Sequence, residues 1–87
     1  MKLKGKRVFI TGASSGLGEA LTRELARRGS VCTIAARRLA RLEEVAKMIH
    51  TAYPAQVQPL PVACEVTDRA SVAAAIEAAV QHMGGID

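Results

Sequence analysis

Short apolar runs alternate with longer segments of helical periodicity along the first part of the chain. Residues 8–11 form an apolar run rich in β-formers, which is typical of a strand buried on both faces. After a glycine-rich turn at 12–18, leucines recur every four residues at positions 17, 21 and 25, which predicts a helix. Gly29 is expected to cap that helix, and residues 31–36 predict a second strand.

The same order continues in the second part of the chain. A second helix should end near Tyr53, because Pro54 cannot continue it. Residues 57–63 predict a third strand that is short or lies at the sheet edge, since Pro59 and Pro61 lack the N–H group that a ladder needs. The apolar positions expected on one side of the second helix are Leu39, Leu42, Val45, Ala46 and Ile49.

A third helix is predicted after the third strand. Thr67 or Asp68 can cap it, and for Asp68 the role of cap is favoured over that of ligand. Gly84 and Gly85 stop it, and residues 86–87 resemble the first step of a fourth strand. Its inward positions are expected to be Val72, Ile76, Ala79, Val80 and Met83.

The order β-α-β-α-β-α predicts parallel strands joined by right-handed helical crossovers. We therefore expect an α/β fold with three parallel strands in the order 3-2-1 and a stub of a fourth beside the first. The length of 87 residues allows one domain, so residues 1–87 are assigned to a single domain.

Composition narrows the classes of function. The net charge of +4 fits either a mildly basic surface or an anionic ligand such as phosphate. The scattered arginines and the presence of only two aromatic residues argue against a nucleic-acid partner. The sequence lacks a signal peptide and a membrane-length apolar run, so no membrane partner is expected.

The cysteines and histidines do not form a recognisable metal or disulfide pattern. Cys32 and Cys64 lie in apolar runs and are expected to be buried free thiols, which suits a reducing, cytoplasmic location. His50 and His82 are each isolated on a predicted helix, so no metal site is assigned.

The sequence Thr-Gly-Ala-Ser-Ser-Gly-Leu-Gly, at 11–18, joins the first predicted strand to the first helix. Gly12 permits a tight turn, Gly16 leaves room for a pyrophosphate, and Gly18 allows close packing of the helix on the sheet. Free N–H groups at the helix start would face the phosphates. A purely structural turn is the alternative, while the spacing excludes a Walker loop.

This loop resembles the cofactor loop of the short-chain dehydrogenase/reductase family, whose fold is of the Rossmann type. The resemblance extends from Lys4 to Asp87 and includes AARR after the second strand, CEVTD after the third and GGID near the end. It implies an oxidoreductase that transfers a hydride between a nicotinamide cofactor and a carbonyl or alcohol carbon. The cofactor-binding residues predicted on this basis are Gly12, Ser14, Ser15, Gly16, Leu17, Gly18, Arg37, Arg38, Glu65 and Val66.

The predicted cofactor is NADP(H) rather than NAD(H). An acidic residue about 20 positions beyond the glycine loop would bind the ribose 2′-hydroxyl, but no carboxylate lies between Glu24 and Glu43. Arg37, with Arg38 as second choice, can instead bind a 2′-phosphate through its guanidinium. The alternative is that both arginines are solvated residues at a helix start, although the helix dipole disfavours cations there.

The resemblance also assigns residues to the 2′-phosphate and the adenine. Ser14 is implied to reach the 2′-phosphate. In the family an Asp-Val pair after the third strand contacts the adenine, and the matching residues are Glu65 and Val66. Glu65 departs from the pattern by one methylene, and Cys64 before it is interpreted as a packing residue.

The catalytic motifs of the family are missing from the sequence. It has neither the Asn-Asn-Ala-Gly stretch nor the Tyr-x-x-x-Lys motif, and its single tyrosine, Tyr53, is followed four positions later by Val57. No catalytic residue is assigned, and a small-molecule substrate is expected only for an intact member.

The intact front half and the missing motifs predict a fragment, a truncated product or a shortened isoform. Three hypotheses remain: the cofactor half of an enzyme, a non-catalytic NADP-binding or subunit-pairing module, and a nonfunctional product. The open edge of the first strand is expected to favour self-association.

Overall fold

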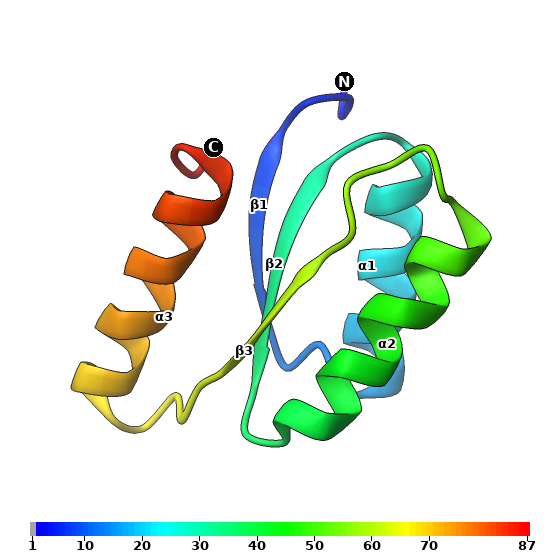
Figure 1. Cartoon of the computed structure of the whole chain (residues 1–87). Helices are drawn as coiled ribbons and strands as arrows, with labels where there is room; N and C mark the ends of the chain where they lie inside the picture. The colour runs from blue at the N-terminus through cyan, green and yellow to red at the C-terminus, as the bar shows by residue number, and fades with distance from the viewer. Residues whose placement is uncertain (1) are drawn as a thin grey trace.

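Strands and helices alternate strictly in the computed structural model, which describes residues 2–87. The order of elements is the predicted one, with parallel strands covered by helices (Figure 1). The elements are β1 (Arg7–Thr11), α1 (Gly16–Arg27), β2 (Val31–Ala36), α2 (Leu39–Ala52), β3 (Leu60–Ala63) and α3 (Arg69–Met83).

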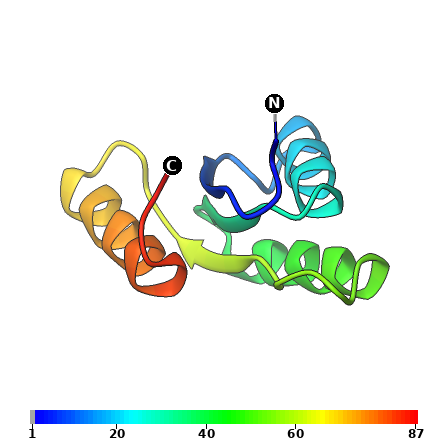
Figure 2. The same cartoon turned by 90° about the horizontal axis from the view of Figure 1, so that it is seen from above.

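The sheet has the strand order β1-β2-β3 with both pairings parallel, which confirms the predicted order 3-2-1. Arg7 lies opposite Val31, and Thr33 lies opposite Leu60. Helices α1 and α2 cover one face of the sheet and α3 covers the other, so that three layers are seen from above (Figure 2). All three strands therefore end at the same edge, at the bottom of Figure 1.

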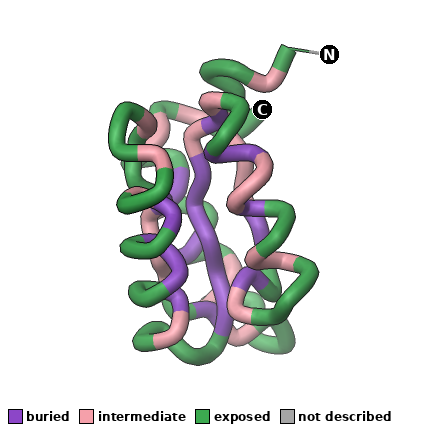
Figure 3. Tube along the Cα trace, turned by 90° about the vertical axis from the view of Figure 1, so that its right-hand side faces the viewer, coloured by how far each residue is buried: buried purple, intermediate pink, exposed green. Residues whose placement is uncertain are grey.

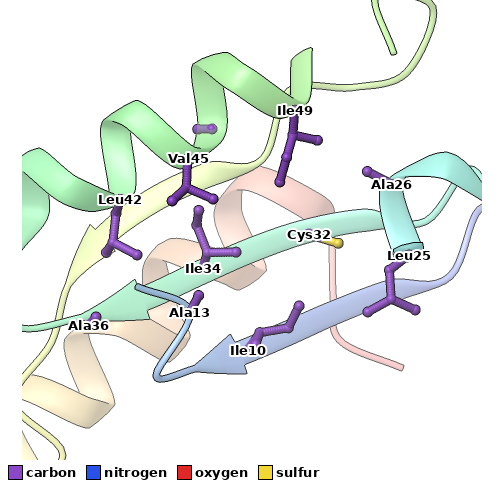
Figure 4. Close-up of a cluster of buried hydrophobic side chains, with 11 residues drawn as sticks. Ile10, Ala13, Leu25, Ala26, Cys32, Ile34, Ala36, Leu42, Val45 and Ile49 are labelled. Carbon is purple, nitrogen blue, oxygen red and sulfur yellow. The ribbon is translucent and has the colours of Figure 1, made fainter. Parts of the chain in front are cut away.

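The main core lies between the sheet and the α1–α2 layer. Leu42, Val45 and Ile49 project from α2 towards Ile34 of β2, and these four side chains are at most 1% exposed (Figure 4). Burying aliphatic side chains of this size contributes roughly 1.5–3 kcal/mol each. The central strand β2 is the most continuously buried segment, as the tube in Figure 3 shows. Leu39, which shares the predicted apolar side of α2, is exposed.

The inward face predicted for α3 is partly wrong. Ala75 and Ala79 are buried, but Ile76 and Val80 are 40% and 42% exposed. The sheet-facing contact is made by small residues, since Ala75 packs in a cluster with Ala35 of β2 and Cys64. Alanines four positions apart let the helix lie close to the sheet, and this turns the larger neighbours towards solvent.

The third strand is shorter than predicted, covering Leu60–Ala63 rather than residues 57–63. Pairing with β2 begins at Leu60, directly after Pro59, which has no N–H group to donate. Its position at the edge of the sheet is as predicted.

The helix ends follow the sequence signals. The Asp68 side chain accepts a hydrogen bond of 3.0 Å from the N–H group of Ala70, which identifies Asp68 as the N-cap of α3. Gly84 ends the same helix with φ +81°, and Gly29 follows α1 with φ +87°. Cys32 and Cys64 are buried free thiols, as expected, and burial raises the pKa of Cys32 to about 11.

The last residues of the chain lie beside β1. Asp87 donates its N–H group to the carbonyl oxygen of Arg7 at 2.8 Å, and its carboxylate accepts from the Arg7 backbone and guanidinium. These hydrogen bonds hold the pKa of Asp87 well below its usual range. The predicted fourth segment is thus placed next to β1, although residues 86–87 are not assigned as a strand. The expected self-association through the β1 edge stays a prediction.

Candidate functional site

A hollow of about 680 Å³ lies where the carboxyl ends of the three strands meet. Loops that follow parallel strands converge at this edge, which is where ligands bind in open α/β sheets. Residues from all three strand ends line the hollow: Thr11, Gly12, Ser14, Ala36, Arg37, Arg38, Cys64 and Val66. This hollow is therefore the candidate binding site.

The glycine turn forms one side of the hollow, and two of its glycines have structural reasons to be glycine. Gly12 has φ +67°, a left-handed conformation that favours glycine directly after β1. Gly18 lies against the turn, because a Cβ added there would collide with the carbonyl oxygen of Gly12 and approach Cα of Ala13 to 2.8 Å. Both roles agree with those predicted from the sequence.

Gly16 has neither of these structural reasons. Its φ is not positive, and an added Cβ would meet no atom within 4 Å. The space in front of its Cα is therefore open, as the close approach of a phosphate would require.

The start of α1 adds free hydrogen-bond donors to this open space. Its first helical hydrogen bond runs from the N–H group of Glu19 to the carbonyl oxygen of Ser15, at 2.8 Å. Among the described residues no side chain caps this helix end, because the Ser15 hydroxyl donates to the carbonyl oxygen of Gly12 instead, at 2.8 Å. The N–H groups of the first turn are thus available to an anion, which the positive end of the helix dipole attracts.

A carboxylate near this end of α1 is neutralised by arginines. Glu19, in the first turn, accepts from Arg41 of α2 at 2.6 Å and lies 3.7 Å from Arg23. The pairing with Arg41 also ties α1 to α2. Because two guanidinium groups face this carboxylate, its repulsion of a bound phosphate is reduced.

Two arginines stand on the side of the hollow that follows β2. Arg37 directly follows the strand, and its side chain is 78% exposed; Arg38 is the N-cap residue of α2. Arg38 makes no side-chain cap hydrogen bond, so neither arginine is recruited to close the helix end. Exposed guanidinium groups at this position can bind an anion in the hollow.

Glu65 lies beyond Arg37, in a smaller neighbouring hollow of about 360 Å³. Its carboxylate oxygen Oε2 is 3.1 Å from Nε of Arg37, and Oε1 accepts from the hydroxyl of Thr67 at 3.0 Å. The hydroxyl of Ser71 accepts from the N–H group of Glu65, which anchors the backbone at this point. Both carboxylate oxygens therefore have partners within the chain.

The structure gathers half of the predicted cofactor residues around the larger hollow. Arg37 and Glu65 meet in the smaller hollow, and the remaining predicted residues belong to the turn and to the first turn of α1. Those that line the larger hollow are Gly12, Ser14, Arg37, Arg38 and Val66, and those that do not are Ser15, Gly16, Leu17, Gly18 and Glu65. The side chain of Leu17 is 84% exposed.

The prediction missed three lining residues: Thr11, Ala36 and Cys64. Each ends a strand or follows one directly. This position could have predicted them as lining residues, because the carboxyl ends of neighbouring parallel strands meet at one edge of the sheet. Cys64 is buried, as packing predicts, yet its position after β3 also makes it part of the wall.

Over residues 2–87, no three histidine, cysteine or acidic side chains come together in a way that could hold a metal ion. In the same range, no helix is both long enough and apolar enough to cross a bilayer. A dinucleotide fits the groups that are present, since the open space at Gly16, the free N–H groups of α1 and the two arginines all suit phosphates.

Comparisons with known proteins agree with this geometry. The family model for short chain dehydrogenases matches residues 6–87. The NADP-dependent 3-hydroxy acid dehydrogenase of Schizosaccharomyces pombe is 39% identical over 87 residues, which cover 99% of this chain and 33% of that protein.

Two solved structures show the same arrangement of elements. One is a 3-ketoacyl-(acyl-carrier-protein) reductase from Brucella melitensis complexed with NADH. It matches with a TM-score of 0.87 and 38% sequence identity, and the match covers 98% of this chain and 32% of that one. The other is an L-sorbose reductase from Gluconobacter frateurii complexed with NADPH and L-sorbose. It matches with a TM-score of 0.89 and 34% sequence identity, and the match covers 100% of this chain and 33% of that one.

The chain is a Rossmann-type α/β protein and belongs to the short-chain dehydrogenase family, whose members are oxidoreductases that bind a nicotinamide dinucleotide. It spans about a third of the length of these relatives.

Proposed function

We propose that this chain forms the adenosine-binding part of an NADP(H)-dependent oxidoreductase. The single observation that carries the proposal is the position of Arg37, whose exposed guanidinium borders the hollow directly after β2. A ribose 2′-phosphate on this side of the hollow would meet Arg37, with Arg38 beside it.

The charges around the hollow support NADP(H) over NAD(H). A carboxylate after β2 would bind a free 2′-hydroxyl and repel a 2′-phosphate, and here that position holds Arg37. A guanidinium binds phosphate with charge-assisted hydrogen bonds, which are roughly twice as strong as neutral ones. The solved relatives carry NADH in one case and NADPH in the other, so the chain's own residues decide the choice.

The role proposed for the chain's own residues is to bind and orient the cofactor. The N–H groups of the first turn of α1 would hold the pyrophosphate, the open space at Gly16 would let it approach, and Val66 would lie against the adenine. When bound, the cofactor would supply the hydride. For the whole protein we propose transfer of that hydride to or from a carbonyl or alcohol carbon.

The test is calorimetric titration of the chain with NADP⁺ and NAD⁺, using the native protein and Arg37→Asp. The native chain should prefer NADP⁺, and the variant should lose affinity for NADP⁺ by about tenfold or more, because a charge-assisted contact is replaced by a repulsion. Lys47→Asp is the matched control, since it makes the same change of charge on the exposed side of α2. Equal selectivity in the native chain and Arg37→Asp would refute the proposal.

A further inference from the structure

The ion pair between Arg37 and Glu65 joins the ends of two neighbouring strands. Arg37 follows β2 and Glu65 lies two residues after β3, and the N–H group of Cys64 donates to the carbonyl oxygen of Ala36 at 2.8 Å to hold the two ends together. Nε of Arg37 then lies 3.1 Å from Oε2 of Glu65. The guanidinium assigned to the 2′-phosphate is already engaged by an anion from the chain itself.

The anion is held more firmly than the cation. Glu65 is anchored by Ser71 through its backbone and by Thr67 through Oε1, and its side chain is 40% exposed. Arg37 has no other partner among the ion pairs of the described residues, and its side chain is 78% exposed. When the ion pair opens, the side chain that moves is therefore that of Arg37. It can turn from the smaller hollow towards the larger one, which it also lines.

We propose that Glu65 is a specificity-determining residue that competes with the ribose 2′-phosphate for Arg37. The inference rests on the proposed function, since it presupposes that Arg37 binds this phosphate. The pair draws the guanidinium towards β3 in the free protein, and the phosphate must replace the carboxylate. Glu65 therefore lowers the affinity for phosphorylated ribose, while a nucleotide without the 2′-phosphate has no need to break the pair.

The size of the effect follows from the exposure of the pair. Exposed ion pairs are weak, and breaking one costs at most a small factor in affinity, up to about fivefold. A 2′-phosphate can exceed this through its double charge and its additional acceptor oxygens. Glu65 is thus expected to reduce the preference for a 2′-phosphate without abolishing it.

The experiment compares adenosine 2′,5′-bisphosphate with adenosine 5′-monophosphate, which differ only in the 2′-phosphate, by NMR titration of the 87-residue chain at fixed pH and salt. Glu65→Gln keeps the shape of the side chain and an acceptor for Thr67 but removes the charge. Its affinity for the bisphosphate relative to the monophosphate should rise by up to about fivefold, and any change at the adenine cancels in this ratio because both ligands carry the adenine. Glu77→Gln, on the exposed side of α3, is the control for net charge.

A second arm separates competition from simple charge repulsion. In the Arg37→Gln background there is no guanidinium to compete for, so Glu65→Gln should no longer raise the affinity for the bisphosphate relative to the monophosphate. A gain that persists in this background, or no gain in the native background, would overturn the competition. If the native chain itself shows no preference for the bisphosphate, the proposed function fails, which is a distinct result.

Discussion

The Cα of Gly18 packs so closely against the carbonyl oxygen of Gly12 that no side chain fits between them. We predict that Gly18→Ala destabilises the fold by about 1–3 kcal/mol, the usual cost of forcing an extra methyl group into a packed site. Urea unfolding measures the difference. Gly16→Ala is the matched control, because its Cβ points into open space, and its stability should stay within about 1 kcal/mol of the native value.

The same pair of variants separates packing from ligand binding. Gly16→Ala should fold normally but bind NADP⁺ weakly, since the methyl group occupies the space in front of the helix start where the pyrophosphate would lie. Calorimetric titration of the folded variant provides the measurement. Native affinity in Gly16→Ala would show that the pyrophosphate lies elsewhere.

The cap of α3 provides a prediction about stability alone. Asp68→Ala removes the acceptor for the N–H group of Ala70 and should cost about 1 kcal/mol in the free energy of unfolding. Asp68→Asn retains a capping oxygen and should stay close to the native value. Equal stability of all three proteins would mean that the cap contributes nothing measurable.

The stability of the fold is expected to depend on pH through the carboxylate of Glu24. Hydrogen bonds from Arg27 and Arg28 lower the pKa of Glu24 from 4.5 to about 2. Because the pKa is lower in the folded state, ionised Glu24 stabilises the fold above pH 4.5, and this contribution is lost as the pH falls towards about 2.

The measurement is urea unfolding of the native protein and Glu24→Gln at several pH values. The advantage of the native protein should be present near neutral pH and shrink between about pH 5 and pH 2. Added salt should reduce it as well, since the side chains are exposed. An advantage that grows as the pH falls would contradict the assignment.

We expect the 87-residue chain alone to show no dehydrogenase or reductase activity. Hydride transfer to a carbonyl needs a positioned acid, and the only tyrosine, Tyr53, caps the far end of α2, roughly 20 Å along the helix from Arg38. An NADPH-oxidation assay with a panel of carbonyl compounds tests this. Turnover that co-purifies with a species of the encoded mass would contradict it.

The sequence predicts the sheet better than it predicts the surfaces of the helices. β2 has the predicted bounds, because a run buried on both faces is apolar throughout. In α3, an unbroken apolar run covers residues 72–76, so periodicity could not distinguish the buried Ala75 from the exposed Ile76. That choice depends on how closely the helix approaches the sheet, which is a tertiary property.

The sequence predicts the location of the candidate site, but it predicts the side-chain contacts there only in part. The glycine spacing and the strand ends locate the hollow, since both follow from the chain order. The pairing of Arg37 with Glu65 could not be predicted, because it depends on the orientation of two side chains that follow different strands and lie 28 residues apart in the sequence. The two carboxylate oxygens of Glu65 contact Arg37 and Thr67. The adenine contact expected for Glu65 stays a prediction.

The order of the strands across the sheet, β1-β2-β3, repeats the order in which a ribosome would make them. Each new strand pairs with the one synthesised just before it, so the sheet can grow by addition at one side while the chain emerges. Domains generally form from the N-terminus during synthesis, and contacts between near neighbours form fastest. The contact of Asp87 with Arg7 spans 80 residues, so it can form only after β1, β2 and β3 have all been synthesised.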